Sequence, residues 1–166
     1  MKKSFRLPTL AEIESAFFSA MSKGYIQNLP PEHTPKIPGL KTVSIAVGDL
    51  LVIDSWVTTP ISKKSSGTTT ISHRRCPVWI MHYGGWFEED VVPFLKAALY
   101  SAYMIERKFY GGRGPVVFDS AEFPNWVYRN TILRNSFQQF SGQEEIHTRT
   151  ECCLGYHWYR GMSLLP

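Results

Sequence analysis

The stretch Thr42-Val43-Ser44-Ile45-Ala46-Val47-Gly48-Asp49-Leu50-Leu51-Val52-Ile53-Asp54-Ser55-Trp56-Val57-Thr58 decides the fold class. Its two runs of β-branched, aliphatic and aromatic residues flank a Gly-Asp pair, so it predicts a short strand over 42–47, a turn, and a longer strand over 50–58. Similar runs of β-branched, aliphatic and aromatic residues predict later strands over 68–73, 78–83, 126–133, 143–148 and 153–159. We therefore expect an antiparallel sheet.

Two helices are expected beside this sheet. Thr9 and Glu12 have the spacing of a capping box, and apolar residues then recur at helical spacing until Lys23-Gly24, where we expect the helix to stop. A second helix is expected to begin at Glu88-Glu89-Asp90, with Pro93 in its first turn, and to end near Arg107. Loops are expected at the proline-rich segment 28–39, the polar segment 60–67, Gly84-Gly85 and 111–115.

The two halves of the chain show a faint similarity. At an offset of 75 residues, five residues of the first half match the second: Ser66, Gly67, Ile71, Arg74 and His82 fall on Ser141, Gly142, Ile146, Arg149 and His157. We expect a single domain over 1–166 with a pseudo-repeat of roughly 9–86 and 88–163. The predicted fold is α+β: a duplicated unit of one helix and three strands, giving a bent antiparallel sheet of about six strands with both helices on one face. A ligand is expected on the opposite, concave face or at the seam.

Composition excludes several classes of protein. The 166 residues suffice for a core, and no apolar run approaches the roughly 20 residues of a membrane span. The net charge of +4 is dispersed, so we do not expect direct nucleic-acid binding. Met1-Lys2-Lys3 resembles the start of a signal peptide, but no apolar segment follows it. Three cysteines, two of them adjacent, suit a reducing cytoplasm, where we expect the protein to reside.

Several short segments resemble one bacterial family of domains of unknown function. They are Val52-Ile53-Asp54-Ser55-Trp56, Pro77 to Gly84, Arg113-Gly114-Pro115, Tyr128-Arg129-Asn130, Phe140 to Ile146, and His157 to Met162. Members of that family occur alone or fused behind Xre-type helix-turn-helix regulators. The resemblance implies an effector-sensing or interaction module associated with transcription regulators, and it implies no particular reaction or ligand. The segment Ser62–Gly67 and His82, where Asn is commoner, depart from the family pattern.

The histidines offer one candidate site. If the repeat holds, His82 and His157 are equivalent residues near the seam, and with Asp54 and Glu144 or Glu145 they would form a metal site or an acid–base pair. The alternative, which we favour, is that each histidine bonds to a neighbouring strand, because no diagnostic ligand spacing is present. For Cys153 a buried apolar role is favoured over a nucleophile beside His157.

Aromatic residues and a few polar anchors offer a second candidate, a small-ligand pocket. Asp54 and Glu144 would anchor the ligand, with Asn130 equivalent to Asp54 at an offset of 76, and a carboxylate facing an aromatic wall suits an amine. Arg113, in a glycine-rich loop, would bind an anion or merely follow a turn. The candidate ligand-binding residues are Asp54, Trp56, Trp79, His82, Tyr83, Trp86, Arg113, Tyr128, Asn130, Glu144 and His157.

These features predict a non-catalytic module that binds a small molecule or a protein partner in a sensing or regulatory setting. We expect no cofactor and no metal. One alternative is an enzyme that acts through Asp54, His82 and His157 at the seam. A further alternative is a structural module that forms homodimers by pairing sheet edges.

Overall fold

The computed structural model describes residues 6–27 and 29–166. The signal-peptide-like opening and Asn28, the first residue of the expected proline-rich loop, lie outside the described residues. No helix in the described part of the chain is long and apolar enough to cross a membrane.

The described residues form one antiparallel sheet of nine strands, in the order β1-β2-β3-β4-β5-β9-β8-β7-β6. The strands are β1 (Glu32–His33), β2 (Leu40–Val47), β3 (Leu50–Thr59), β4 (Ser62–His73), β5 (Cys76–Phe87), β6 (Val117–Phe118), β7 (Trp126–Ser136), β8 (Gln139–Thr148) and β9 (Cys153–Ser163). The prediction of an α+β fold with about six strands is therefore wrong, because the chain is mostly sheet. β1 and β6, with two residues each, are shorter than the runs of about four to eight residues that mark a strand in a sequence.

Strands β4 and β5 are also longer than predicted. The polar segment 62–67 was expected to be a loop, but it pairs with β5 through partners such as Ser65 with Gly85 and Ser66 with Gly84. The two glycines, expected to break the sheet, lie inside β5. A Cβ at Gly84 would lie 3.1 Å from Trp158, and one at Gly85 would overlap the backbone of Tyr156, so glycine allows β9 to approach closely.

Helix α1 (Leu10–Met21) begins at the predicted capping box. The Thr9 hydroxyl accepts from the Glu12 amide at 3.2 Å, and the Glu12 carboxylate accepts from the Thr9 amide at 2.7 Å. The predicted stop at Lys23-Gly24 is wrong, because the chain continues as a π-helical segment, η1 (Ser22–Ile26).

Helix α2 (Val92–Tyr100) follows a short 3₁₀ turn, η2 (Glu89–Val91). Pro93 lies in the first turn of α2, where its missing amide proton leaves no helical hydrogen bond unmade. A second π-helical segment, η3 (Ser101–Glu106), ends at Arg107, whose backbone is left-handed.

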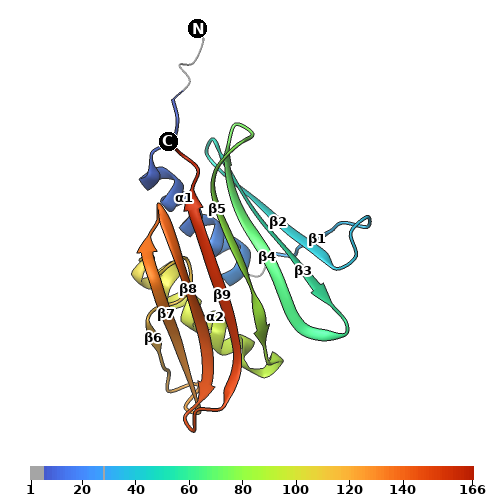
Figure 1. Cartoon of the computed structure of the whole chain (residues 1–166), viewed down its shortest axis with the longest axis vertical. Helices are drawn as coiled ribbons and strands as arrows, with labels where there is room; N and C mark the ends of the chain where they lie inside the picture. The colour runs from blue at the N-terminus through green and yellow to red at the C-terminus, as the bar shows by residue number, and fades with distance from the viewer. Residues whose placement is uncertain (1–5, 28) are drawn as a thin grey trace.

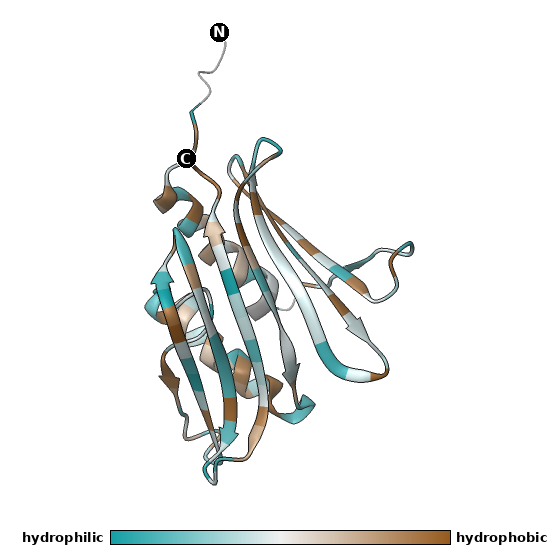
Figure 2. Cartoon of the chain, in the orientation of Figure 1, coloured by the Kyte–Doolittle hydropathy of each residue, from teal (hydrophilic) through white to brown (hydrophobic). Residues whose placement is uncertain are grey.

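Both helices lie on the same face of the sheet (Figure 1). Buried residues alternate with more exposed ones along β8, because one face packs on the helices and the other does not. Figure 2 shows both hydrophilic and hydrophobic residues on the strands of this sheet. Phe17 of α1 packs against Trp79 of β5, with ring centroids 5.3 Å apart, and Phe94 of α2 packs against Trp126 of β7 at 5.9 Å. We call these two faces of the sheet the helix-covered face and the open face.

Candidate functional site

Two tyrosines lie opposite each other at the centre of the sheet. Tyr83 of β5 and Tyr159 of β9 are Cα partners in the β5–β9 ladder. Tyr83 is also the partner of Gly67 in β4, and Tyr159 is the partner of Gly142 in β8. A Cβ at either glycine would overlap the tyrosine hydroxyl. Each glycine therefore leaves room for a tyrosine ring to lie across the neighbouring strand on the helix-covered face.

Each tyrosine hydroxyl donates a hydrogen bond to a different polar side chain. Tyr83 donates to Asp54 Oδ1 at 2.9 Å, and Tyr159 donates to Asn130 Oδ1 at 2.6 Å. Asp54 lies on β3 at the same place as Asn130 on β7, since Asp54 pairs with Thr69 just as Asn130 pairs with Glu144. The two halves of the sheet thus carry the same arrangement, but only the first half has a carboxylate at the tyrosine hydroxyl.

His82 and His157 do not occupy equivalent places. The offset between equivalent residues is 75 for β4 and β8 but 76 for β5 and β9, as the pairing of Gly67 with Tyr83 and of Gly142 with Tyr159 shows. A shift of one residue in a strand moves a side chain to the other face. His82 therefore lies on the open face, where it hydrogen-bonds Thr68 at 3.1 Å, and the expected pairing with His157 is wrong.

A cavity of about 260 Å³ lies between the helices and the sheet, beside the Tyr83–Asp54 hydrogen bond. We call it the Tyr83 cavity. It brings together five of the candidate residues, namely Asp54, Trp56, Tyr83, Arg113 and His157. Its other walls, which no pattern in the sequence marks as a site, are Met21, Lys63, Ser65, Thr69, Met81, Phe87, Val92, Leu95 and Tyr103.

Asp54 is held in one orientation inside this site. Its Oδ1 accepts hydrogen bonds from Thr69 Oγ1 at 2.7 Å and from Tyr83. Among the described residues, Oδ2 has no hydrogen-bond partner and Asp54 forms no ion pair. Burial raises the pKa of Asp54, although the two hydroxyl donors and the nearby Arg113 partly oppose this rise.

Arg113 and Glu144 form a buried ion pair behind the cavity. Glu144 Oε1 accepts from Arg113 Nε at 2.8 Å and also from Nη2, while Oε2 accepts from Tyr128 at 2.7 Å. Burial acts to raise the pKa of Glu144, but Arg113 and His157 outweigh it and lower the pKa to about 2. Glu144 is therefore ionised and satisfied within the protein, and it balances the charge of Arg113.

His157 lies on the helix-covered face between this ion pair and the cavity. Its Nδ1 is 3.5 Å from Glu144 Oε1 but makes no hydrogen bond in the described part of the chain. Its ring packs edge-on against Phe87, with centroids 4.7 Å apart. Burial lowers the pKa of His157, so the ring is neutral at pH 7.

The remaining candidates lie away from the cavity. Trp79 is core, stacked between Phe137 and Phe140, and Trp86 packs against Tyr156. Tyr128 and Asn130 are buried, and both side chains form hydrogen bonds with Gly114. The Tyr128 hydroxyl accepts from the Gly114 amide, and Asn130 Nδ2 donates to the Gly114 carbonyl. The cysteines, for which burial was favoured at Cys153, are all exposed.

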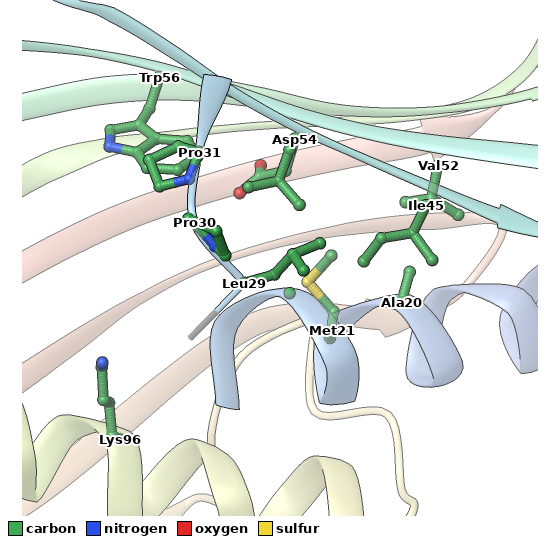
Figure 3. A pocket seen from close by; sticks show the side chains of 12 residues that line it. Ala20, Met21, Leu29, Pro30, Pro31, Ile45, Val52, Asp54, Trp56 and Lys96 are labelled. Carbon is green, nitrogen blue, oxygen red and sulfur yellow. The ribbon is translucent and has the colours of Figure 1, made fainter. Parts of the chain in front are cut away.

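A second cavity adjoins the first and is shown in Figure 3. We call it the Leu29 cavity. Its volume is about 250 Å³, and its walls come from α1, η1, β2, β3, α2 and the segment after η1: Ala20, Met21, Gly24, Leu29, Pro30, Pro31, Val43, Ile45, Val52, Asp54, Trp56 and Lys96. The alternation on β3 places Val52, Asp54 and Trp56 on one side, and this signal was readable in the sequence.

The protein therefore belongs to the class of antiparallel sheet proteins that hold a cavity between the sheet and the helices, and the Asp54 carboxylate lines this cavity. The described residues contain no group of three His, Cys, Asp or Glu side chains able to hold a metal ion. Neither family models, nor curated proteins, nor solved structures give a match to this chain. The resemblance to a bacterial family of domains of unknown function therefore stays a prediction.

Proposed function

We propose that this protein is a non-catalytic binding module that takes a small organic cation beside Asp54. The observation that carries the proposal is the Oδ2 oxygen of Asp54. It belongs to a half-buried carboxylate that two hydroxyl donors hold at the wall of the cavity, and it has no hydrogen-bond partner among the described residues. A ligand ammonium would donate a hydrogen bond to this oxygen and would pair with the charge of the carboxylate.

The charges around the Tyr83 cavity support a cation rather than an anion. The charge of Arg113 is matched by Glu144, and Lys63 is paired with Glu88. His157 is neutral at pH 7, since burial lowers its pKa. Asp54, when ionised, carries the charge at this cavity that has no ion-pair partner in the described residues. Trp56 adds an aromatic ring, and aromatic rings attract cations.

The alternatives receive less support from the geometry. An enzyme that uses Asp54, His82 and His157 together is disfavoured, because His82 lies on the open face. A dimer formed by edge pairing is disfavoured because both outer strands of the described sheet, β1 and β6, have two residues each and offer few backbone groups.

We place the module in the cytoplasm, because its three exposed, unpaired thiols suit a reducing compartment.

The test is isothermal titration calorimetry with octylamine and octanoate, which share an apolar chain and carry opposite charges. The unaltered protein should bind octylamine in a saturable way and should bind octanoate at least about tenfold more weakly, a difference of about 1.4 kcal/mol. Asp54→Asn should remove this preference. Equal binding of the two probes, or octylamine binding unchanged by Asp54→Asn, would contradict the proposal.

A further inference from the structure

Asp54 lies on the boundary between the two cavities. Met21, Asp54 and Trp56 line both the Tyr83 cavity and the Leu29 cavity. Figure 3 shows Asp54 projecting from β3 toward the middle of the Leu29 cavity, between Trp56 on one side and Val52 on the other. A charged group bound at Asp54 therefore has space on two sides.

The volumes indicate that one ligand uses both spaces. The Leu29 cavity has about 250 Å³ and the Tyr83 cavity about 260 Å³. Each is smaller than the roughly 300–1,000 Å³ of typical small-molecule sites, whereas the two together fall within that range. A ligand anchored at their boundary would fill both.

The walls of both cavities favour apolar groups on either side of the charge. The Leu29 cavity presents Val43, Ile45 and Val52, and the Tyr83 cavity presents Met81 and Leu95. Such walls disfavour a second positive charge on either arm of a ligand, because that charge would lose its water without gaining a polar partner.

We propose that the ligand is a secondary or tertiary amine, with its nitrogen at Asp54 Oδ2 and one apolar substituent in each cavity. This inference rests on the proposed function and adds the shape of the ligand to it. A primary amine on an unbranched chain has a single arm and can fill one cavity only. A secondary amine with two apolar chains buries the same number of carbons while keeping its charge at the boundary.

The test compares dibutylamine with octylamine by isothermal titration calorimetry on the unaltered protein. The two probes are isomers with the same charge, so they differ in whether the nitrogen is central or terminal. Dibutylamine should bind at least about tenfold more tightly. Dibutyl ether, which has the shape of dibutylamine without the charge, should not bind measurably, and a diamine with a charge at each end of an octyl chain should bind more weakly than octylamine.

Variants that fill one cavity test the two arms separately. Ile45→Phe reduces the Leu29 cavity and Val92→Phe reduces the Tyr83 cavity, so each should lower the affinity for dibutylamine several-fold. Val57→Phe, on the exposed side of β3, is the matched control and should leave the affinity unchanged. Circular dichroism establishes that each variant is folded, and the comparison of isomers does not depend on any variant.

The outcomes separate the shape of the ligand from the binding of a cation. If octylamine binds as tightly as dibutylamine or more tightly, and Asp54→Asn weakens both, the two-arm inference is overturned and the proposed function stands. If neither amine binds, or if Asp54→Asn leaves their affinities unchanged, both proposals are overturned. Tighter binding of dibutylamine that is lost with Asp54→Asn supports both.

Discussion

Tyr83 and Tyr159 face each other across the central β5–β9 ladder, and each lies over a glycine of the next strand. Their hydroxyls nevertheless donate to different groups, Asp54 for Tyr83 and Asn130 for Tyr159. The same arrangement therefore holds a carboxylate in one half and a neutral amide in the other. In the second half, Glu144 forms an ion pair with Arg113 inside the protein, whereas in the first half Asp54 faces a cavity.

Asp54→Asn should increase stability while reducing cation binding. The pKa of Asp54 is raised in the folded protein, so the ionised side chain disfavours folding. This penalty is absent below the unfolded-state pKa of about 3.9 and complete above the folded-state pKa. In urea titrations the variant should gain stability over the unaltered protein as the pH rises from about 4 to 7. A variant that is less stable at pH 7 would contradict this explanation.

Removing one tyrosine hydroxyl should affect binding, and removing the other should not. Tyr83→Phe and Tyr159→Phe each delete one hydrogen bond, so each should lower the free energy of unfolding by about 1 kcal/mol. Only Tyr83→Phe removes one of the two hydrogen bonds that hold the Asp54 carboxylate, so it alone should weaken octylamine binding. Calorimetry on the two variants makes the comparison, and equal losses of affinity would show that Tyr83 does not position Asp54.

Arg113→Met should be strongly destabilising. It leaves the fully buried Glu144 without its cation, and breaking such a pair typically costs about 3–5 kcal/mol. The double variant Arg113→Met/Glu144→Leu should recover much of this loss, because no charge then remains buried. Urea unfolding measures both. A double variant no more stable than Arg113→Met would indicate that packing rather than charge governs this region.

Acid should remove the stability that Glu144 contributes. The pKa of Glu144 is about 2 in the folded protein, below the unfolded value of about 4.3. Its contribution is thus complete above about pH 4.3 and is lost as the pH falls toward 2; the amount is on the order of 3 kcal/mol. Glu144→Gln should flatten the decrease in stability across this range. If the decrease is equally steep in both proteins, another carboxyl group is responsible.

The two histidines should behave differently. His157 lines the Tyr83 cavity, so His157→Ala should change the affinity for octylamine or dibutylamine. His82→Ala, on the open face, should leave both affinities within error of the unaltered protein. An effect of His82→Ala as large as that of His157→Ala would contradict the assignment of the binding site to the helix-covered face.

Much of the sheet could be predicted because β-branched and aromatic runs mark strands locally. The hairpin around Gly48-Asp49 and the Thr9 capping box are local in this sense and were predicted correctly. The strands β1 and β6 could not be predicted, because two-residue strands depend on their neighbours rather than on their own sequence. The polar first half of β4 was missed for a related reason: its pairing with Gly84-Gly85 outweighs its loop-like composition.

In the candidate site, too, local sequence patterns predicted some features, whereas features that depend on distant residues were missed. Asp54, Trp56 and Tyr83 were predicted to be binding residues, and alternation along strands places them on one face. His82 was misplaced because the offset of 75 fits β4 and β8 but fails by one residue at β5 and β9. The packing of Trp79 between Phe137 and Phe140 joins residues far apart in the sequence, so no local pattern distinguished a core tryptophan from a pocket tryptophan.

Native mass spectrometry of gently purified protein, with Asp54→Asn prepared in parallel from the same host, tests whether a small cation occupies the site at Asp54. We expect the unaltered protein to carry a non-covalent additional mass that dissociates as a small organic cation, and we expect Asp54→Asn to lack it. A bound mass that proves to be an anion, or one retained in full by Asp54→Asn, would show that Asp54 does not bind a cation.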